Sequence, residues 1–150
     1  MIRVASVVVR KGKAYTCVAA QTEAGFYVDS EPVFVVDLHT DEVLAALEKV
    51  IALGHPSVPT PTVEEMRKRP GLIPSAAGVS SWKKLAQGGA SYSIQWRKDG
   101  TITLFISRLD NKGRFEWDPA RTRTFAGNTP LRIIVETIFE DVHSRHELGE

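Results

Sequence analysis

The sequence predicts an α+β domain with a mainly antiparallel β-sheet packed against helices, and two stretches carry most of this prediction. Between Ser91 and Arg108, apolar and polar residues alternate on both sides of Lys98-Asp99-Gly100. Such alternation around Asp-Gly indicates a β-hairpin, because glycine tolerates the positive φ of a tight turn. Residues 130–146 predict a long C-terminal helix with apolar residues at spacings of three and four. We expect this helix to cover the hairpin, since each fully buried large side chain contributes roughly 1.5–3 kcal/mol.

The N-terminal segment predicts a second hairpin. Residues 2–10 and 14–20 are both β-prone and flank Lys11-Gly12-Lys13. The apolar run Val4–Val9 alternates poorly, so it is either a strand buried on both faces or a poorly ordered terminus, and we favour the strand.

Two short strands are expected next, at residues 26–28 and 33–36, separated by Ser30-Glu31-Pro32. Proline lacks the N–H that a central ladder position needs, so Pro32 should sit at a strand start or at an edge.

The first helix is predicted from Thr40 as its cap to Gly54 as its stop. Its apolar positions recur at helical spacing: Val43, Leu44, Leu47, Val50 and Ile51. A proline-rich loop at residues 55–61 follows.

Two shorter helices are expected in the middle of the chain. Thr62 with Glu65 has capping-box spacing for a helix over residues 63–69, which Pro70 ends. Residues 71–79 are small and predict a loop. A helix over residues 82–87 is capped by Ser80 or Ser81 and closed by Gly88-Gly89.

After the central hairpin we expect a turn at residues 109–113 and a strand at 115–117, and residues 121–125 form either a short strand or an extended return. Thr129 as cap and Pro130 at the first helical position open the last helix. Ile133 and Phe139 should widen its apolar face. No repeat or internal boundary is visible, so residues 1–150 are expected to form a single domain.

Composition narrows the functional classes. The 150 residues carry a net charge of +1, which gives no global field to attract nucleic acid or an anionic membrane. A single cysteine, Cys17, cannot form an internal disulfide, and no segment has the layout of a membrane span or a signal peptide. We therefore expect a cytoplasmic protein that does not bind membranes.

Candidate catalytic and metal-binding residues each have a simpler structural explanation. His143 and His146 are three apart on a helix but have no third ligand cluster, and His39 and His55 sit at helix edges.

Ser81 and Lys84 match Ser-x-x-Lys, as do Ser80 and Lys83, without the other motifs of a penicillin-binding enzyme. Gly88-Gly89 lacks the motif of a phosphate-binding loop. Cys17 is expected to be a buried, inert thiol. We expect no catalytic, cofactor or metal site.

Charged residues offer two binding hypotheses. The arginines at 108, 114, 121 and 123, with Tyr92, Trp96 and Trp117, are compatible with a nucleic-acid-binding sheet face. The aromatic residues share parity with the apolar ones, however, so they should face the core, which makes nucleic acid the weaker hypothesis. On the last helix, Glu136, Glu140 and Asp141 form either a plain solvated face or an acidic patch that meets a basic partner.

From Ser81 onward the chain resembles the immunity proteins of bacterial contact-dependent growth inhibition systems. The segments that carry the resemblance are SWKKLAQGGASYSIQW, ITLFISRLDNKGRFEWDPARTRTF and PLRIIVETIFEDVHSR. They cover roughly the last half of the chain, and their motifs are structural: a short Trp helix, Gly-Gly, the hairpin, Lys-Gly-Arg, Asp-Pro and a terminal helix with Glu-Asp.

The resemblance implies a small cytoplasmic protein that binds and neutralises one cognate toxin domain, commonly a nuclease, in a one-to-one complex. Inhibitors of nucleases are often strongly acidic and this chain is not, so acidic complementarity must be local; we expect Glu136, Glu140 and Asp141 to be rim contacts. Two alternatives are a nucleic-acid-binding accessory domain and a small enzyme whose site is assembled from dispersed residues such as His39 or His143.

Overall fold

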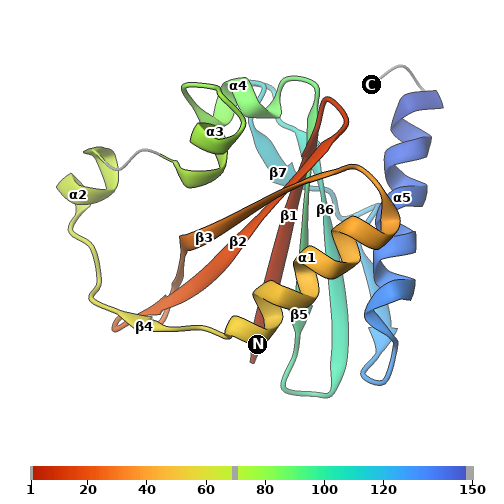
Figure 1. Cartoon of the computed structure of the whole chain (residues 1–150), viewed down its shortest axis with the longest axis horizontal. Coiled ribbons are helices and arrows are strands. Elements are labelled where there is room, and N and C mark those ends of the chain that lie inside the picture. The colour runs from red at the N-terminus through yellow and green to blue at the C-terminus, as the bar shows by residue number, and fades with distance from the viewer. Residues whose placement is uncertain (1, 69–70, 148–150) are drawn as a thin grey trace.

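The computed structural model describes residues 2–68 and 71–147. Strands come first and helices are interleaved with later strands, which confirms the predicted α+β class (Figure 1). The elements, in chain order, are β1 (Arg3–Arg10), β2 (Lys13–Thr22), β3 (Tyr27–Asp37), α1 (Thr40–Leu53), β4 (Ser57–Val58), α2 (Val63–Lys68), α3 (Leu72–Ala76), α4 (Trp82–Ala86), β5 (Gly89–Trp96), β6 (Thr101–Leu109), β7 (Phe115–Trp117), β8 (Arg123–Ala126) and α5 (Leu131–Glu147).

In the described part of the chain the strands form one eight-stranded sheet with the order β3-β2-β1-β5-β6-β7; β4 pairs with β2, and β8 pairs with β6. All pairings are antiparallel except the two-residue contact between β2 and β4. The predicted central hairpin is β5–β6, with Tyr92 opposite Ile106. Because β1 lies beside β5, the N-terminal strands join the same sheet as the central hairpin.

Helices α1 and α5 cover one face of this sheet (Figure 1). The apolar stripe of α5 lies against the hairpin, as predicted, and buries Ile134, Val135 and Ile138 completely. The remaining large members of this core come from the sheet and from α1: Val7, Val9, Val43, Leu44, Leu47, Tyr92, Ile94, Ile102, Leu104 and Ile106.

The opposite face is covered by α3 and α4, whose Ile73 and Leu85 pack with Val8 in a second, smaller core. Val8 therefore points to one side of the sheet, while Val7 and Val9 point to the other. The Val4–Val9 run is a strand whose later residues are buried on both faces, which explains its poor alternation.

The region predicted as two short strands is one strand, β3. The register between β2 and β3 shifts at Cys17/Val18, so that Glu31 and Pro32 are left outside the pairing. The Glu31–Pro32 peptide bond is cis. Since β3 is the outermost strand, the missing N–H of Pro32 costs no central ladder bond, in keeping with the predicted edge position.

Other boundaries differ from the prediction because tertiary contacts decide them. The segment predicted as a loop at 71–79 contains α3, which forms where Ile73 enters the second core. The loop predicted at 55–61 contributes β4 to the edge of β2. Thr40 is the first residue of α1 rather than its cap, and His39 occupies the cap position without a side-chain hydrogen bond.

The expected caps of the short helices are present. The Thr62 hydroxyl accepts from the Glu65 N–H at 3.1 Å, and the Ser81 hydroxyl accepts from the Lys84 N–H at 3.2 Å. The predicted stop at Pro70 lies outside the described residues.

His55 fills a gap in the sheet between β1 and β2, which pair only at their turn-proximal ends. Its Nδ1 lies 2.7 Å from the Ala19 carbonyl oxygen on β2, and its Nε2 accepts from the Val4 N–H on β1 at 3.2 Å. The hydroxyl of Thr16 bridges the same gap by donating to the Ser6 carbonyl at 2.6 Å. These two side chains replace ladder hydrogen bonds where the strands separate.

Candidate partner-binding surface

Three exposed side chains form a stripe along α5: Ile133, Glu136 and Glu140. Their spacings of three and four residues place them on one side of the helix. Ile133 was predicted to widen the buried face, but it is 44% exposed. This outer stripe of α5 therefore presents one large apolar side chain followed by two carboxylates.

The carboxylates of the stripe are not paired with a counter-charge in the described part of the chain. Arg132, four residues before Glu136, forms an ion pair with Asp41 instead, with Nη1 and Oδ1 3.0 Å apart. That contact links α5 to the start of α1. Over residues 2–68 and 71–147, neither Glu136 nor Glu140 takes part in a hydrogen bond or an ion pair. No ion pair among these described residues therefore offsets their mutual repulsion, which is worth a few tenths of a kcal/mol.

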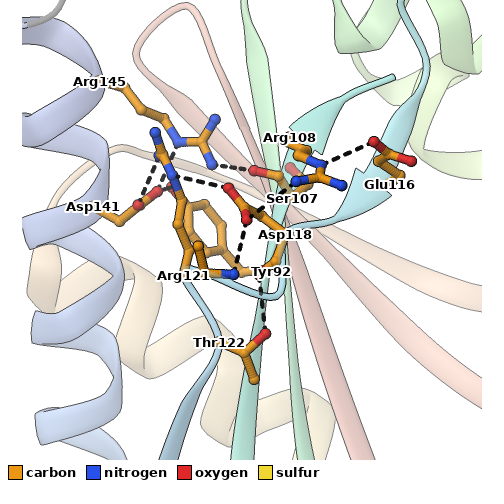
Figure 2. Close-up of polar contacts among 10 residues, drawn as sticks. Tyr92, Ser107, Arg108, Glu116, Asp118, Arg121, Thr122, Asp141 and Arg145 are labelled. Atoms are coloured by element: carbon orange, nitrogen blue, oxygen red, sulfur yellow. Dashed lines mark hydrogen bonds and ion pairs between the residues drawn. The ribbon is translucent and has the colours of Figure 1, made fainter. Parts of the chain in front are cut away.

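Asp141, the third predicted rim residue, is not a surface residue. Its side chain is 11% exposed. It accepts from Tyr92 Oη at 2.6 Å, from Arg121 Nη1 at 3.0 Å and from Arg145 Nε at 2.7 Å (Figure 2). A carboxylate held by three donors on its own chain has little capacity left for a partner, which argues against Asp141 as a direct contact.

Asp141 belongs instead to an arginine–carboxylate network that fixes α5 to the sheet edge (Figure 2). Arg121 Nε also lies 3.4 Å from Asp118 Oδ2. Arg108 pairs with two carboxylates: its Nη1 lies 3.6 Å from Asp118 Oδ1, and its Nε lies 2.9 Å from Glu116 Oε1. Arg145 donates to the Ser107 carbonyl of β6. Three arginines thus alternate with three carboxylates, and the network ties α5 to β6, β7 and the segment that follows β7.

Tyr92 gives this network a neutral donor from inside the core. Burial, and then its hydrogen bond to Asp141, raise the pKa of the Tyr92 phenol well above its ordinary value. The hydroxyl therefore remains protonated and donating throughout the physiological pH range. The network and the apolar face together hold α5 in place, and so they orient the outer stripe.

Three of the four arginines of the nucleic-acid hypothesis are engaged with carboxylates, and the fourth, Arg123, is exposed. Arg108 and Arg121 lie in the network, and Arg114 Nε pairs with Asp110 Oδ2 at 3.1 Å. Tyr92 is fully buried, and Trp96 packs against the core under Arg3, so neither offers a stacking platform. Trp117 is the exception to the predicted inward parity, since it is 44% exposed and packs against Phe105 at 5.8 Å.

The remaining candidates are the two histidines of α5 and the cysteine. His143 is exposed on α5, and the side chain of His146 lies outside the described residues. No group of three metal-ligating side chains occurs in the described ranges. Cys17 is buried, and burial together with Asp29 raises the pKa of its thiol to about 12.

Sequence reasoning missed two parts of this surface. Helical periodicity placed Ile133 in the core, because the pattern does not show how wide a face the sheet can cover. The long-range pairs Arg132–Asp41 and Tyr92–Asp141 join residues far apart in the chain, and no local spacing signals them.

Comparison with known proteins adds a fold but no function. No protein-family model matches the sequence, and no curated protein is similar enough to match it. The solved structure of a protein of unknown function from Neisseria meningitidis is similar, with a TM-score of 0.65, 12% sequence identity and coverage of 90% of each chain. None of the described helices is long and apolar enough to cross a membrane.

Proposed function

We propose that this chain is a cytoplasmic immunity protein of a contact-dependent growth inhibition system, which binds one cognate toxin domain and neutralises it by occlusion. It acts by binding and carries out no reaction of its own. The observation that carries the proposal is the outer stripe of α5, in which Ile133 is exposed beside the carboxylates of Glu136 and Glu140, which are unpaired among the described residues.

The composition of the stripe supports protein binding. Stable interfaces bury apolar anchors at the centre and keep charged groups at the rim, where complementary charge speeds association and selects the partner. Many toxins of such systems are nucleases, whose substrate clefts must be basic to hold a phosphate backbone. Two adjacent carboxylates on a rigid helix complement such a cleft despite the near-neutral total charge.

The elements that carry the family resemblance also build this surface. The region from Ser81 onward contains α4, the central hairpin, β7, β8 and α5, together with all members of the arginine–carboxylate network. Nucleic-acid binding is less favoured, because Arg108, Arg114 and Arg121 are paired with carboxylates on the same chain.

The proposal implies a toxin gene next to the gene for this chain, and the decisive experiment is protection against that toxin. The toxin's C-terminal domain should kill cells when expressed alone, and coexpression of the 150-residue chain should restore growth. The two proteins should copurify, and calorimetry should give one-to-one stoichiometry. A strain lacking this gene that remains fully resistant to its siblings, or a toxin domain that never binds the chain, would refute the proposal.

A further inference from the structure

A concave pocket of about 630 Å³ opens next to the network, between the β1–β2 turn, the α4–β5 junction and the C-terminal part of α5. Its charged lining is cationic, and in the described part of the chain no carboxylate lines it. The cationic residues of this basic pocket are Arg10, Lys11, Arg108, Arg121 and Arg145.

The positive charge of the basic pocket is only partly balanced. Arg108, Arg121 and Arg145 form ion pairs with the three carboxylates of the network, which do not line the pocket. Arg10 and Lys11 stand outside that network and add two positive charges at the β1–β2 turn. The pocket consequently has a local excess of positive charge in a molecule whose net charge is only +1.

The guanidinium of Arg10 lines the basic pocket without a partner, since nothing in the described ranges hydrogen-bonds or ion-pairs with it. Its Nε is buried as well as unsatisfied. A buried donor without an acceptor costs folding free energy, and buried charged donors in particular are normally satisfied by an acceptor. Nε itself is closed off from solvent, so an anionic oxygen in the basic pocket would accept from the terminal N–H groups of the same guanidinium, whose planar fork suits carboxylate and phosphate.

The walls of the basic pocket are largely apolar. Leu38, Ala86, Ala90 and Val142 line it. At Gly89 a Cβ would lie 2.6 Å from the Leu85 carbonyl oxygen, so the close approach of α4 to β5 that shapes this wall requires glycine. Apolar walls with a few converging polar groups are typical of small-molecule sites.

We propose that the basic pocket binds a small organic anion, which has an apolar body and one carboxylate or phosphate head group. The head group contacts Arg10 and Lys11, and the body lies between Leu38 and Val142. This site is separate from the outer stripe of α5 and does not depend on the immunity function.

Calorimetric titration of the intact protein with octanoate, octyl phosphate and octanol tests the site. At least one of the two anions should bind, and octanol, which lacks the charge, should bind at least about tenfold more weakly. Arg10→Met keeps the apolar stem and removes the charge, so it should weaken anion binding by about tenfold or more. Arg97→Met, at the far turn of the central hairpin, is the matched control and should leave binding unchanged.

Lys11→Asn keeps the test decisive if Arg10→Met does not fold. Lys11 has a φ of 49°, a conformation that asparagine adopts readily, so the backbone should be preserved while the charge is lost. Failure of both anions to bind, equal binding of octanol, or undiminished binding in the folded variants would overturn the proposal. A hexaglutamate peptide that binds more tightly than either anion would also overturn it, since the pocket would then suit an acidic protein segment.

Discussion

The hydroxyl of Tyr92, on β5, donates a 2.6 Å hydrogen bond to Asp141 Oδ2, on α5, across 49 positions of the chain (Figure 2). The ring of Tyr92 lies in the same core as Ile134 and Ile138, so its polar tip meets α5 at the edge of an apolar contact. Apolar packing is not directional, whereas a hydrogen bond of this kind forms only within a narrow range of distance and angle. The pair therefore helps to fix the position of α5 along the sheet.

Tyr92→Phe removes this hydrogen bond while keeping the ring. We expect the free energy of unfolding to fall by roughly 1.5–3 kcal/mol, the usual contribution of a hydrogen bond to a charged group. Tyr15→Phe is the matched control, because the Tyr15 hydroxyl has no hydrogen bond within residues 2–68 and 71–147. Urea unfolding followed by circular dichroism measures both variants. Equal stability of the two would show that the Tyr92–Asp141 bond contributes nothing.

Asp141→Asn should be more damaging than Tyr92→Phe. It leaves the guanidinium groups of Arg121 and Arg145 in a mostly buried site without their shared carboxylate. Breaking such a pair costs about 3 kcal/mol or more, because the remaining charges stay desolvated. Glu140→Gln, the exposed neighbour on the same helix, should change stability by less than about 0.5 kcal/mol. A thermal melt in which both variants unfold together would contradict the assigned role of Asp141.

The contrast between Glu140 and Asp141 also shows what sequence could and could not reveal. Alternation around Asp99-Gly100 and the apolar spacing of residues 130–146 depend on neighbouring residues, so the central hairpin and α5 were predicted correctly. Adjacent carboxylates on one helix look alike in sequence. Only the arrival of Tyr92 and Arg121 from elsewhere in the chain makes one of them buried and leaves the other exposed. The basic pocket likewise joins six separate segments of the chain, which no local pattern connects.

His55→Ala should loosen the gap between β1 and β2. The substitution leaves the Val4 N–H and the Ala19 carbonyl without their shared partner. We expect a loss of about 1–3 kcal/mol of unfolding free energy and faster hydrogen exchange of the Val4 amide. His143→Ala, at an exposed position on α5, is the control and should have little effect on either. A protected Val4 amide in His55→Ala would show that the strands do not need this bridge.

Stability should fall at alkaline pH in a way that depends on Cys17. The folded thiol has a pKa of about 12, raised from 9.0 mainly by burial. Its stabilising contribution is therefore complete below pH 9 and is lost as the pH rises toward 12, because the unfolded chain releases the proton first. The slope attributable to this group approaches about 1.4 kcal/mol per pH unit. Cys17→Ala, compared with the wild type in urea titrations between pH 8 and pH 11, should show a shallower decline; identical slopes would mean that the thiol titrates normally.

Charge reversal on the outer stripe of α5 tests where the toxin binds. The double variant Glu136→Lys and Glu140→Lys should weaken toxin binding and reduce its dependence on salt, because both carboxylates are exposed and have no partner in the described chain. Thermal stability should stay nearly intact, since the repulsion between two lysines replaces that between two glutamates. Glu48→Lys, an exposed helical glutamate on α1, is the matched control and should leave affinity unchanged. Calorimetry at two salt concentrations separates the outcomes. If the double variant and Glu48→Lys bind the toxin with equal affinity, the interface lies elsewhere, and the exposed Trp117 and Leu109 become the next surface to mutate.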